Sequence, residues 1–415
     1  MYNLADSVIV GNLISATALG AVGLTSSMTW LLTAICTSIG AGVNIAVAQY
    51  FGAKKETDIQ ESISVSYLIA VIASIFLTAA CFLAARPVIF GFLQAPEEMR
   101  FDSMAYFLIY SGGIIFQLLY NVTYGILRAH GDSRGALIFL MISAALNIVL
   151  DCLFISVFHM GVSGAAAATV IAQAGSAIAS FLYLRHIFPD LLPKRHYLYA
   201  WKGQGALLMR LSIPIMLQTG VNSIGFLILQ RLINSFGAPS IEGYAAMLKV
   251  EQLAHIPSQS FNVAISSFAG QNIGAEKLDR ARRGYRTTIL MGVLISISIS
   301  IVVLLFDRPL LQIFNITGES LRRAKEHLDI LMFFIWTSTN IACGFLQGAG
   351  DVKIPAASGF INLGIRLALS FLLALTPVGF RCYYVSMPPA WLIACFVVVM
   401  RYRSGKWREF RIVKE

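Results

Sequence analysis

Two polar residues inside one strongly apolar stretch carry the clearest chemical signal in this chain. The stretch GALIFLMISAALNIVLDCLFISVF, residues 135–158, is long enough to cross a membrane as a helix, and it contains Asn147 and Asp151. A spacing of four places both side chains on one helix face, so an amide and a carboxylate point into the same small volume. Burying a carboxylate at this depth costs roughly 2.5–3.5 kcal/mol on insertion scales. Such an acid is normally kept where it faces a bundle interior and takes part in function.

The composition of the chain indicates an integral membrane protein. Of its 415 residues, 57% are hydrophobic and only 13% are charged. The mean hydropathy of +0.73 is far above that of soluble globular domains. We predict eleven complete membrane-spanning helices and a fragment of another at the start. The predicted spans lie near residues 21–50, 60–85, 101–127, 135–157, 164–184, 206–235, 242–270, 284–306, 326–347, 354–376 and 383–401.

The net charge of +10 could suggest nucleic-acid binding, but the basic residues gather in alternate loops. One set of loops and the tail hold 21 of the 31 Lys and Arg, whereas the opposite loops hold 7. By the positive-inside rule the first set is cytoplasmic. We therefore expect a multi-pass protein of the cytoplasmic (inner) membrane of a prokaryote. Both termini would be cytoplasmic in the full-length protein, and the basic tail would lie at the headgroups of the lipid bilayer, without a nucleic-acid role.

Enzyme and metal chemistry find little support in the sequence. The six cysteines are scattered without a CxxC or metal-like spacing, so we interpret them as small core residues. No HExxH, GxSxG, P-loop or paired-His pattern occurs in or beside the predicted spans. We expect a protein that is not an enzyme and uses no cofactor. No oligomerisation signal is visible, so a monomer is expected.

An internal repeat divides the chain into two halves. AVAQYFGAKK (46–55) resembles FAGQNIGAEK (268–277), and YGILRAHGD (124–132) resembles CGFLQGAGD (343–351), with offsets of 222 and 219. Two halves of six helices that begin on the same side are expected to be related by an axis along the membrane normal. The predicted parts are an N-lobe 1–184 (helices 1–6, helix 1 incomplete), a cytoplasmic linker 185–205, a C-lobe 206–402 (helices 7–12) and a basic tail 403–415.

The repeat also predicts that the sequence begins inside its first membrane helix. Carrying the offset backwards places Met1 opposite about residue 224. The segment GALLMRLSIPIMLQTGVNS, 205–223, then has no counterpart in the first half. We expect a missing N-terminal segment of roughly one and a half helical segments.

Several short sequence motifs follow one another in a defined order along the whole chain. In the first half they are ADSVIVGNL with LGAVGL, a Gln-x-x-Gly-Ala turn, LRAHGDSR, LNIVLDCLFI and GVSGAAAATVIAQ. In the second half they are AAMLKVEQLAHIPSQSF and GQNIGAEKLDRARRG. In this order they resemble the multidrug and toxic compound extrusion (MATE) family of cation-coupled antiporters. The resemblance implies an all-α membrane protein with two six-helix lobes around a central drug cavity.

The resemblance further implies a coupling-ion site in the first lobe. In the DinF-like branch this site is formed by an Asp on the first helix, an Asn and an Asp on the fifth and a Thr on the sixth. The matching residues here are Asp6, Asn147, Asp151 and Thr169. Two carboxylates in a low-dielectric pocket cannot both be ionised cheaply, so the pair is expected to hold a proton near neutral pH. The same oxygens are hard ligands that could bind Na⁺ as a metal site, and the sequence leaves both ions open.

The second half carries polar residues of its own within predicted spans. Ser370 repeats Asp151 and Arg366 repeats Asn147, which favours the DinF-like branch over a NorM-like one that also uses acids there. For Glu251 our first interpretation is an ion pair with an arginine, and a substrate or second-ion role is the alternative. Further residues that could line a cavity are Gln49, Gln271, Tyr120, Tyr124, Trp336 and Phe345.

Together these patterns predict a secondary active exporter. H⁺ or Na⁺ would move inward in exchange for an organic cation or amphipathic drug moving outward. One alternative is a flippase for a lipid-linked oligosaccharide, although such a protein would be expected to line its groove with several basic residues. Another is a non-transporting truncated remnant, and Asp151 could also serve packing alone.

Overall fold

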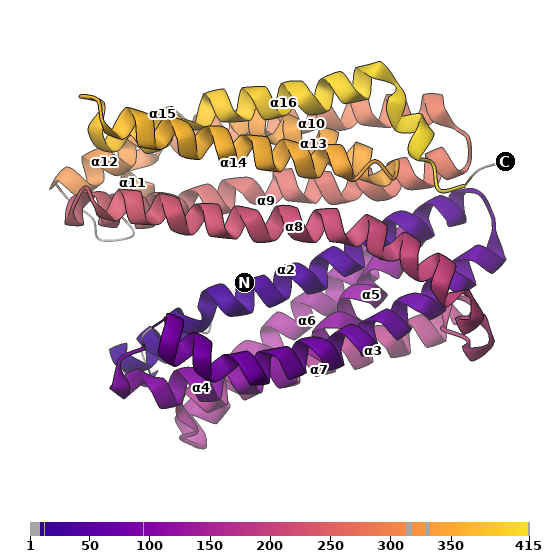
Figure 1. The fold of residues 1–415 in the computed structure, drawn as a ribbon, viewed down its shortest axis with the longest axis horizontal. Coiled ribbons are helices and arrows are strands. Elements are labelled where there is room, and N and C mark those ends of the chain that lie inside the picture. The colour runs from indigo at the N-terminus through magenta and orange to yellow at the C-terminus, as the bar shows by residue number, and fades with distance from the viewer. Residues whose placement is uncertain (1–8, 12, 94, 313–317, 329–332, 414–415) are drawn as a thin grey trace. The chain divides into compact units, whose positions relative to one another are not determined.

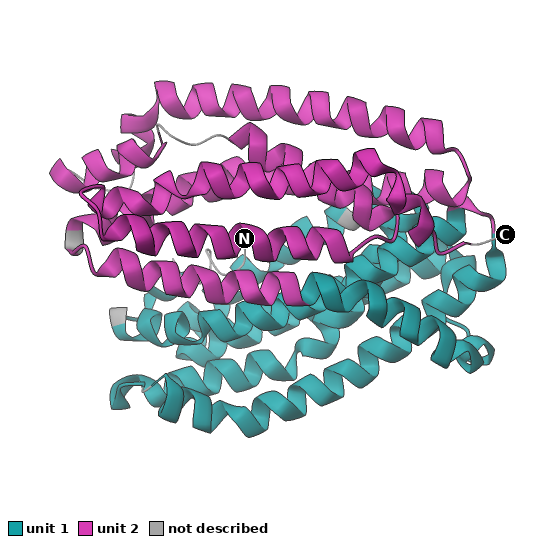
Figure 2. Cartoon of the chain, turned by 45° about the horizontal axis from the view of Figure 1, so that its top comes forward, with its two compact units in different colours: residues 1–51, 55–216 teal, residues 52–54, 217–415 magenta. Residues whose placement is uncertain are grey.

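The computed structural model describes residues 9–11, 13–93, 95–312, 318–328 and 333–413, and the regular structure in this part of the chain is helical (Figure 1). The chain divides into two compact units (Figure 2). Unit 1 comprises residues 1–51 and 55–216, and unit 2 comprises residues 52–54 and 217–415. The all-α fold with two lobes is therefore confirmed.

The helices of unit 1 are joined by short turns. In chain order, with the labels of Figure 1, they are α2 (Ala16–Gly52), α3 (Glu56–Arg86), the π-helical turn η1 (Pro87–Phe92), α4 (Glu97–Gly112), α5 (Ile114–His130), α6 (Ser133–Cys152), the π-helical turn η2 (Leu153–Val157), α7 (Gly161–Ile187), η3 (Pro189–Leu191) and η4 (Arg195–Ala200). The next helix, α8 (Trp201–Asn234), contains the division between the two units, after Met216.

Unit 2 continues with a second series of helices. They are α9 (Ala238–Gly274), α10 (Leu278–Leu305), α11 (Asp307–Gln312), α12 (Gly318–Leu328), α13 (Phe333–Gly348), α14 (Lys353–Ala374), η5 (Gly379–Arg381), α15 (Cys382–Val385), α16 (Met387–Ser404) and η6 (Lys406–Phe410). Buried side chains of α9, α13 and α16 form much of the apolar core of this unit.

Eight of the described helical segments are long and apolar enough to cross a membrane. Two bent pairs, α4 with α5 and α12 with α13, raise the number to ten if each pair is one span. Described helices lie in all eleven predicted spans, and residues 329–332 of the span 326–347 lie outside the described part of the chain. The remaining one, α9, has 37 residues but a more polar composition, since it carries Glu242, Lys249, Glu251 and His255.

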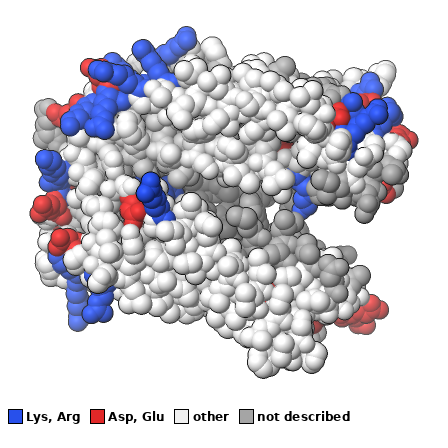
Figure 3. Space-filling view, turned by 180° about the vertical axis from the view of Figure 1, so that it is seen from behind, with Lys and Arg blue, Asp and Glu red and all other residues white. Residues whose placement is uncertain are grey.

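The surface of the helices suits a lipid environment. Large apolar side chains point outward, such as Phe76, Leu83 and Leu375, which are 71%, 81% and 88% exposed. On the face drawn in Figure 3, charged side chains gather toward the helix ends. An exposed apolar surface of this extent is unfavourable in water and favourable against lipid.

The same helix crossing occurs in both units, as the repeat predicts. In unit 1 a Cβ added to Gly125 of α5 would lie 2.4 Å from the carbonyl oxygen of Gly40 on α2. In unit 2 a Cβ added to Gly344 of α13 would lie 2.3 Å from the carbonyl oxygen of Asn262 on α9. Asn262 repeats Gly40, and its Nδ2 donates to the Asn340 carbonyl at 2.7 Å. Only glycine allows two helix backbones to approach this closely.

A repeated aspartate fixes the helix that follows each crossing. Asp132 caps α6 by accepting from the Gly135 N–H at 2.9 Å, and it also accepts from the Tyr183 hydroxyl of α7 at 2.8 Å. Its repeat, Asp351, is fully buried and accepts from Nε of Arg401 on α16 at 2.6 Å. The aspartate at this repeated position therefore has different hydrogen-bond partners in the two halves.

The glycine crossing predicts a position-specific loss of stability. Gly344→Ala should lower the free energy of unfolding by about 1–3 kcal/mol, because the added methyl group meets backbone that cannot turn away. Gly364→Ala on α14 is the matched control, since a Cβ there meets no atom within 4 Å. Thermal unfolding of the purified protein in detergent measures both. Equal melting temperatures for the two variants would contradict this packing.

The repeated aspartate predicts unequal effects in the two halves. Asp351→Asn should cost about 3 kcal/mol, because Arg401 would lose the carboxylate that neutralises it in a largely buried site. Asp132→Asn should cost about 1 kcal/mol, because its partners are neutral donors. The same melting experiment tests this order, and a larger loss for Asp132→Asn would show that the assignment of roles is wrong.

Candidate functional site

One face of α6 packs against α7 through a ladder of polar contacts. The Ser176 hydroxyl of α7 donates to the Phe139 carbonyl at 3.1 Å, and the Ser143 hydroxyl of α6 donates to the Ala172 carbonyl at 2.9 Å. Asn147 follows one turn later on the same face of α6. The spacing of four between Phe139, Ser143 and Asn147 explains why these residues all meet α7.

At the next step of this ladder lie three of the predicted site residues. Asn147 and Asp151 are 0% exposed and Thr169 is 1% exposed. Nδ2 of Asn147 donates to the Thr169 hydroxyl at 3.3 Å, and that hydroxyl donates to the Ala165 carbonyl at 3.1 Å. Because Nδ2 faces Thr169, the amide oxygen of Asn147 is left as an acceptor, and it has no hydrogen-bond partner among the described residues.

The surroundings of this group are apolar. Val10, Ile155, Val162 and Ala165 belong to one buried cluster beside the end of α6 and the start of α7. The helix also changes its form here, since α6 continues after Cys152 into the π-helical turn η2. Single π-helical turns occur frequently at functional sites. An acid, an amide and a hydroxyl thus share a region that excludes water.

The fourth predicted member, Asp6, lies outside the described residues. The donors that the structure does place are carboxylate, amide and hydroxyl oxygens, which suit a proton or a hard cation. Among the described residues, no three His, Cys, Asp or Glu side chains converge as in a transition-metal site.

The other candidates of unit 1 lie elsewhere in the bundle. Gln49 is fully buried on α2. Tyr120 and Tyr124 of α5 lie with ring centroids 5.8 Å apart, and the guanidinium of Arg128 lies 4.8 Å from the Tyr124 ring centroid. Arg128 follows directly after the predicted span 101–127, but the structure places it within α5 and over an aromatic ring. Gln271, the repeat of Gln49, is half-buried on α9 of unit 2.

In unit 2 the positions that repeat Asn147 and Asp151 are also buried, but they hold different groups. Arg366 is 7% exposed and donates to the hydroxyl of Tyr383 on α15. Ser370 is fully buried and shares a hydrogen bond of 2.8 Å with Ser386. The repeat therefore preserves a buried polar position on the fifth helix of each half and changes its chemistry.

The predicted ion pair of Glu251 with an arginine is not a direct contact among the described residues, because Arg366 acts on this carboxylate only from a greater distance. Its carboxylate instead lies 3.7 Å from Nε2 of His255, one turn later on α9. Within the described residues, no arginine nitrogen lies within 4 Å of this carboxylate. His255 stacks on Trp336 of α13 with centroids 5.3 Å apart, so Trp336 is a core contact of this cluster. Phe345, another predicted cavity residue, is fully buried against Tyr285 and Trp407.

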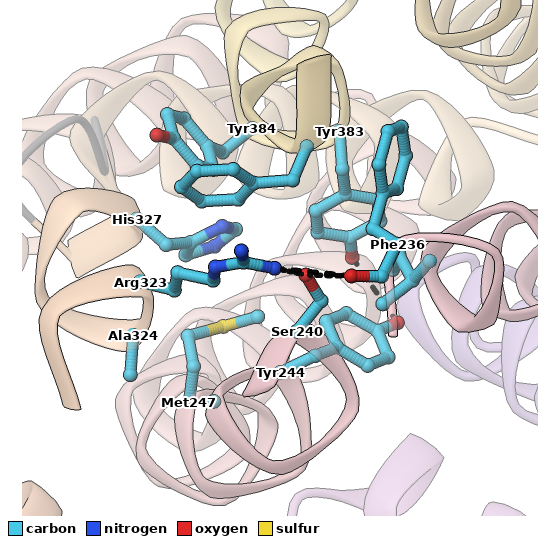
Figure 4. A pocket seen from close by; sticks show the side chains of 12 residues that line it. Phe236, Ser240, Tyr244, Met247, Arg323, Ala324, His327, Tyr383 and Tyr384 are labelled. Atoms are coloured by element: carbon cyan, nitrogen blue, oxygen red, sulfur yellow. Dashed lines mark hydrogen bonds between the residues drawn. The ribbon is translucent and has the colours of Figure 1, made fainter. Parts of the chain in front are cut away.

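A small cavity in unit 2 lies beside Tyr383, the hydrogen-bond partner of Arg366 (Figure 4). Its walls include Tyr244, His327, Tyr383 and Tyr384, and its volume is about 30 Å³. Arg323 reaches between these side chains and donates to the Ser240 hydroxyl and the Phe236 carbonyl. No sequence pattern indicates this cluster, because its members come from α9, α12 and α15 without a regular spacing.

Comparison with known proteins places these features in a family. The MatE family model matches residues 1–153 and again residues 214–372. One relative is "Probable multidrug resistance protein YpnP" of Bacillus subtilis (strain 168). It is 27% identical over an alignment of 423 positions, which covers 100% of this chain and 93% of the relative. Another is "Probable multidrug resistance protein NorM" of Thermotoga maritima, 24% identical over 99% of this chain and 89% of the relative.

Solved structures agree on the fold. "Outward-facing conformation of a multidrug resistance MATE family transporter of the MOP superfamily" superposes with a TM-score of 0.88 at 21% identity, over 98% of this chain and 92% of that one. The family model accounts for well over half of the chain, with one match in each half of the repeat. The chain therefore belongs to the MatE family, the multidrug and toxic compound extrusion transporters.

Proposed function

We propose that this chain is a secondary active multidrug antiporter. It exports cationic or amphipathic compounds in exchange for H⁺ or Na⁺, and Asp6, Asn147, Asp151 and Thr169 bind the coupling ion. The observation that carries the proposal is the complete burial of Asn147, Asp151 and Thr169 between two apolar helices. A carboxylate kept at this depth is expensive, so its retention indicates that it binds a proton or a cation.

The geometry supports an oxygen-lined site. Nδ2 of Asn147 is directed at the Thr169 hydroxyl. Its amide oxygen is thereby directed away from Thr169 and available to a cation or to a protonated carboxyl group. Asp151, one turn further along the same face, supplies negative charge. The related proteins named above are described as multidrug resistance proteins, which supports a drug as the exported compound.

Coupling requires more than binding. An ion drives transport only if it binds the two access states with different affinity. The site lies where the α6 helix passes into the π-helical turn η2, so a change in the local winding of this helix could alter the distances between the oxygens. We propose that alternating access uses this difference. Basic residues in alternate loops support cytoplasmic placement of those loops and of the tail.

Removal of the buried charge gives the first test of this function. Asp151→Asn keeps the shape of the side chain but cannot carry a negative charge, so ethidium efflux from a drug-hypersensitive host should fall at least about tenfold. Glu98→Gln is the matched control, because Glu98 is an exposed acid at the start of α4. Wild-type efflux in the Asp151→Asn variant, at equal amounts of protein in the membrane, would sink the coupling proposal.

The threonine hydroxyl gives a finer test. Thr169→Val removes the acceptor for Asn147 at constant volume, so the apparent affinity for the coupling ion should fall about two- to tenfold. Thr169→Ser keeps the hydroxyl and should stay close to wild type. Ser176→Ala controls for helix packing, since Ser176 joins the same two helices about two turns away. Ethidium efflux measured against Na⁺ concentration and against pH reports the change, and equal curves for Thr169→Val and Ser176→Ala would remove Thr169 from the site.

A further inference from the structure

A pocket at one end of unit 2 is lined mainly by charged side chains. It has a volume of about 560 Å³ and lies where the turn between α9 and α10 meets the C-terminal segment η6, on the side where Figure 1 marks the C-terminus. Its charged lining residues are Lys277, Arg280, Arg282, Arg408, Glu276 and Asp279. The four basic side chains outnumber the two acidic ones, so the pocket is positively charged and suits an anion.

The C-terminal segment is fixed to the bundle by a buried tryptophan. Trp407 is 1% exposed, and its ring packs edge-on against Phe345 of α13 with centroids 5.1 Å apart. Its Nε1 donates to the Tyr402 carbonyl at 3.1 Å. The next residue, Arg408, is thereby brought to the turn between α9 and α10, far away in the sequence. The pocket is therefore built by tertiary packing and not by one basic stretch of the chain.

Three of the four basic side chains lack an acidic partner. They are Lys277, Arg280 and Arg408. Within the described part of the chain, no carboxylate lies within 4 Å of any of them. The two acids of the wall are engaged by other arginines, since Asp279 lies 3.5 Å from Arg282 and Glu276 lies 3.4 Å from Arg411. Cations that share one pocket repel one another, and a bound anion would offset this repulsion.

Two of the unpaired groups are guanidiniums that lie over aromatic rings. The Arg280 guanidinium is 5.9 Å from the Phe268 ring centroid, and that of Arg408 is 5.6 Å from the Trp407 ring centroid. Such contacts restrict the position of a guanidinium without using its N–H donors. Two adjacent N–H groups of an arginine match two oxygens of a phosphate. The donors therefore favour a phosphate over a compact anion with a single acceptor.

The surface of α10 beyond the pocket favours a lipid over a dissolved anion. Positions 282, 286, 290 and 294 follow at intervals of four and so lie along one side of the helix. They hold in turn Arg282, Arg286, Leu290 and Leu294. The two leucines are 61% and 56% exposed, and α10 is long and apolar enough to cross a membrane. A molecule with an anionic head and acyl chains would contact the basic pocket and this apolar surface together, whereas a dissolved phosphate would contact only the pocket.

We propose that this pocket binds the phosphate of an anionic phospholipid whose acyl chains lie along the exposed side of α10. Lys277, Arg280 and Arg408 contact the phosphate oxygens. The repeat supports a site particular to the second half, because Asp58 and Gln60 stand where unit 2 has Arg280 and Arg282. The inference goes beyond the proposed export function and does not depend on it.

Native mass spectrometry of the purified full chain in detergent, titrated with phosphatidylglycerol or phosphatidylcholine, tests this site. Wild type should bind its first phosphatidylglycerol at least about tenfold more tightly than its first phosphatidylcholine, which carries no net charge. Lys277→Gln combined with Arg408→Gln should weaken phosphatidylglycerol binding at least about tenfold, because each basic residue contributes about fivefold near an anionic lipid. Arg408→Lys, which keeps the charge, should stay within about threefold of wild type. Equal affinities for the two lipids in wild type would overturn the proposal.

The repeated turn after α2 offers a matched control. Lys54→Gln combined with Lys55→Gln removes the same charge from the corresponding turn of the first half, where both lysines are exposed. This control should change phosphatidylglycerol binding by less than about twofold, because neither lysine lines the pocket. Equal losses in the two double variants would show that overall positive charge, and not this pocket, attracts the lipid, and would overturn the proposal.

Competition with glycerol 3-phosphate separates a lipid from a dissolved phosphate. This compound carries a phosphate but no acyl chains, so at the concentration that half-saturates phosphatidylglycerol binding it should displace less than about a tenth of the bound lipid. Displacement of half of the bound lipid or more would show a site for dissolved phosphates and would contradict the assignment to a phospholipid.

Discussion

The cost of burying polar groups in an apolar medium governs this structure. Inside a membrane-spanning bundle no water is available, so each amide, hydroxyl or charge must find a partner on a neighbouring helix or in a ligand. Most do so directly, as Ser143 and Ser176 show in joining α6 to α7. The groups that remain open to a ligand are few, and they define where chemistry can occur. Among the described residues they include the amide oxygen of Asn147 in unit 1 and Nε of Arg366 and Nε2 of His327 in unit 2.

The duplication explains how one scaffold carries buried polar groups of different chemistry at matching positions. The crossing at Gly40 and Gly125 in unit 1 returns at Asn262 and Gly344 in unit 2, with backbones equally close. Packing at this crossing tolerates almost no added volume, so the repeat could change little there. The fifth helix of each half, α6 in unit 1 and α14 in unit 2, can differ more in the charge of its side chains. There unit 1 has an amide and a carboxylate where unit 2 has a guanidinium and a hydroxyl, and this difference in polarity changes which ligand each position can contact.

Much of the fold could be predicted from the sequence, because spans, turns and the repeat are local patterns. Asn147 and Asp151 could be predicted as candidate site residues, because they lie four residues apart in one apolar helix. Thr169 was accessible only through the family resemblance, since its contact with Asn147 joins two helices. The nearest partner of Glu251 could not be predicted, because three-dimensional packing brings His255 closer to this carboxylate than any described arginine. The pairing of Tyr244 with Tyr383 joins residues 139 positions apart and leaves no trace in a linear pattern.

The proposed exchange of a drug for an ion requires above all that the buried oxygens of unit 1 bind an ion that the drug displaces. Addition of ethidium to purified protein in weakly buffered solution, or to protein loaded with radioactive sodium, measures this exchange directly. Wild type should release H⁺ or Na⁺ in proportion to the bound ethidium, and Asp151→Asn should bind ethidium without releasing either ion. Equal release from wild type and Asp151→Asn, or no release of either ion from wild type, would contradict the account.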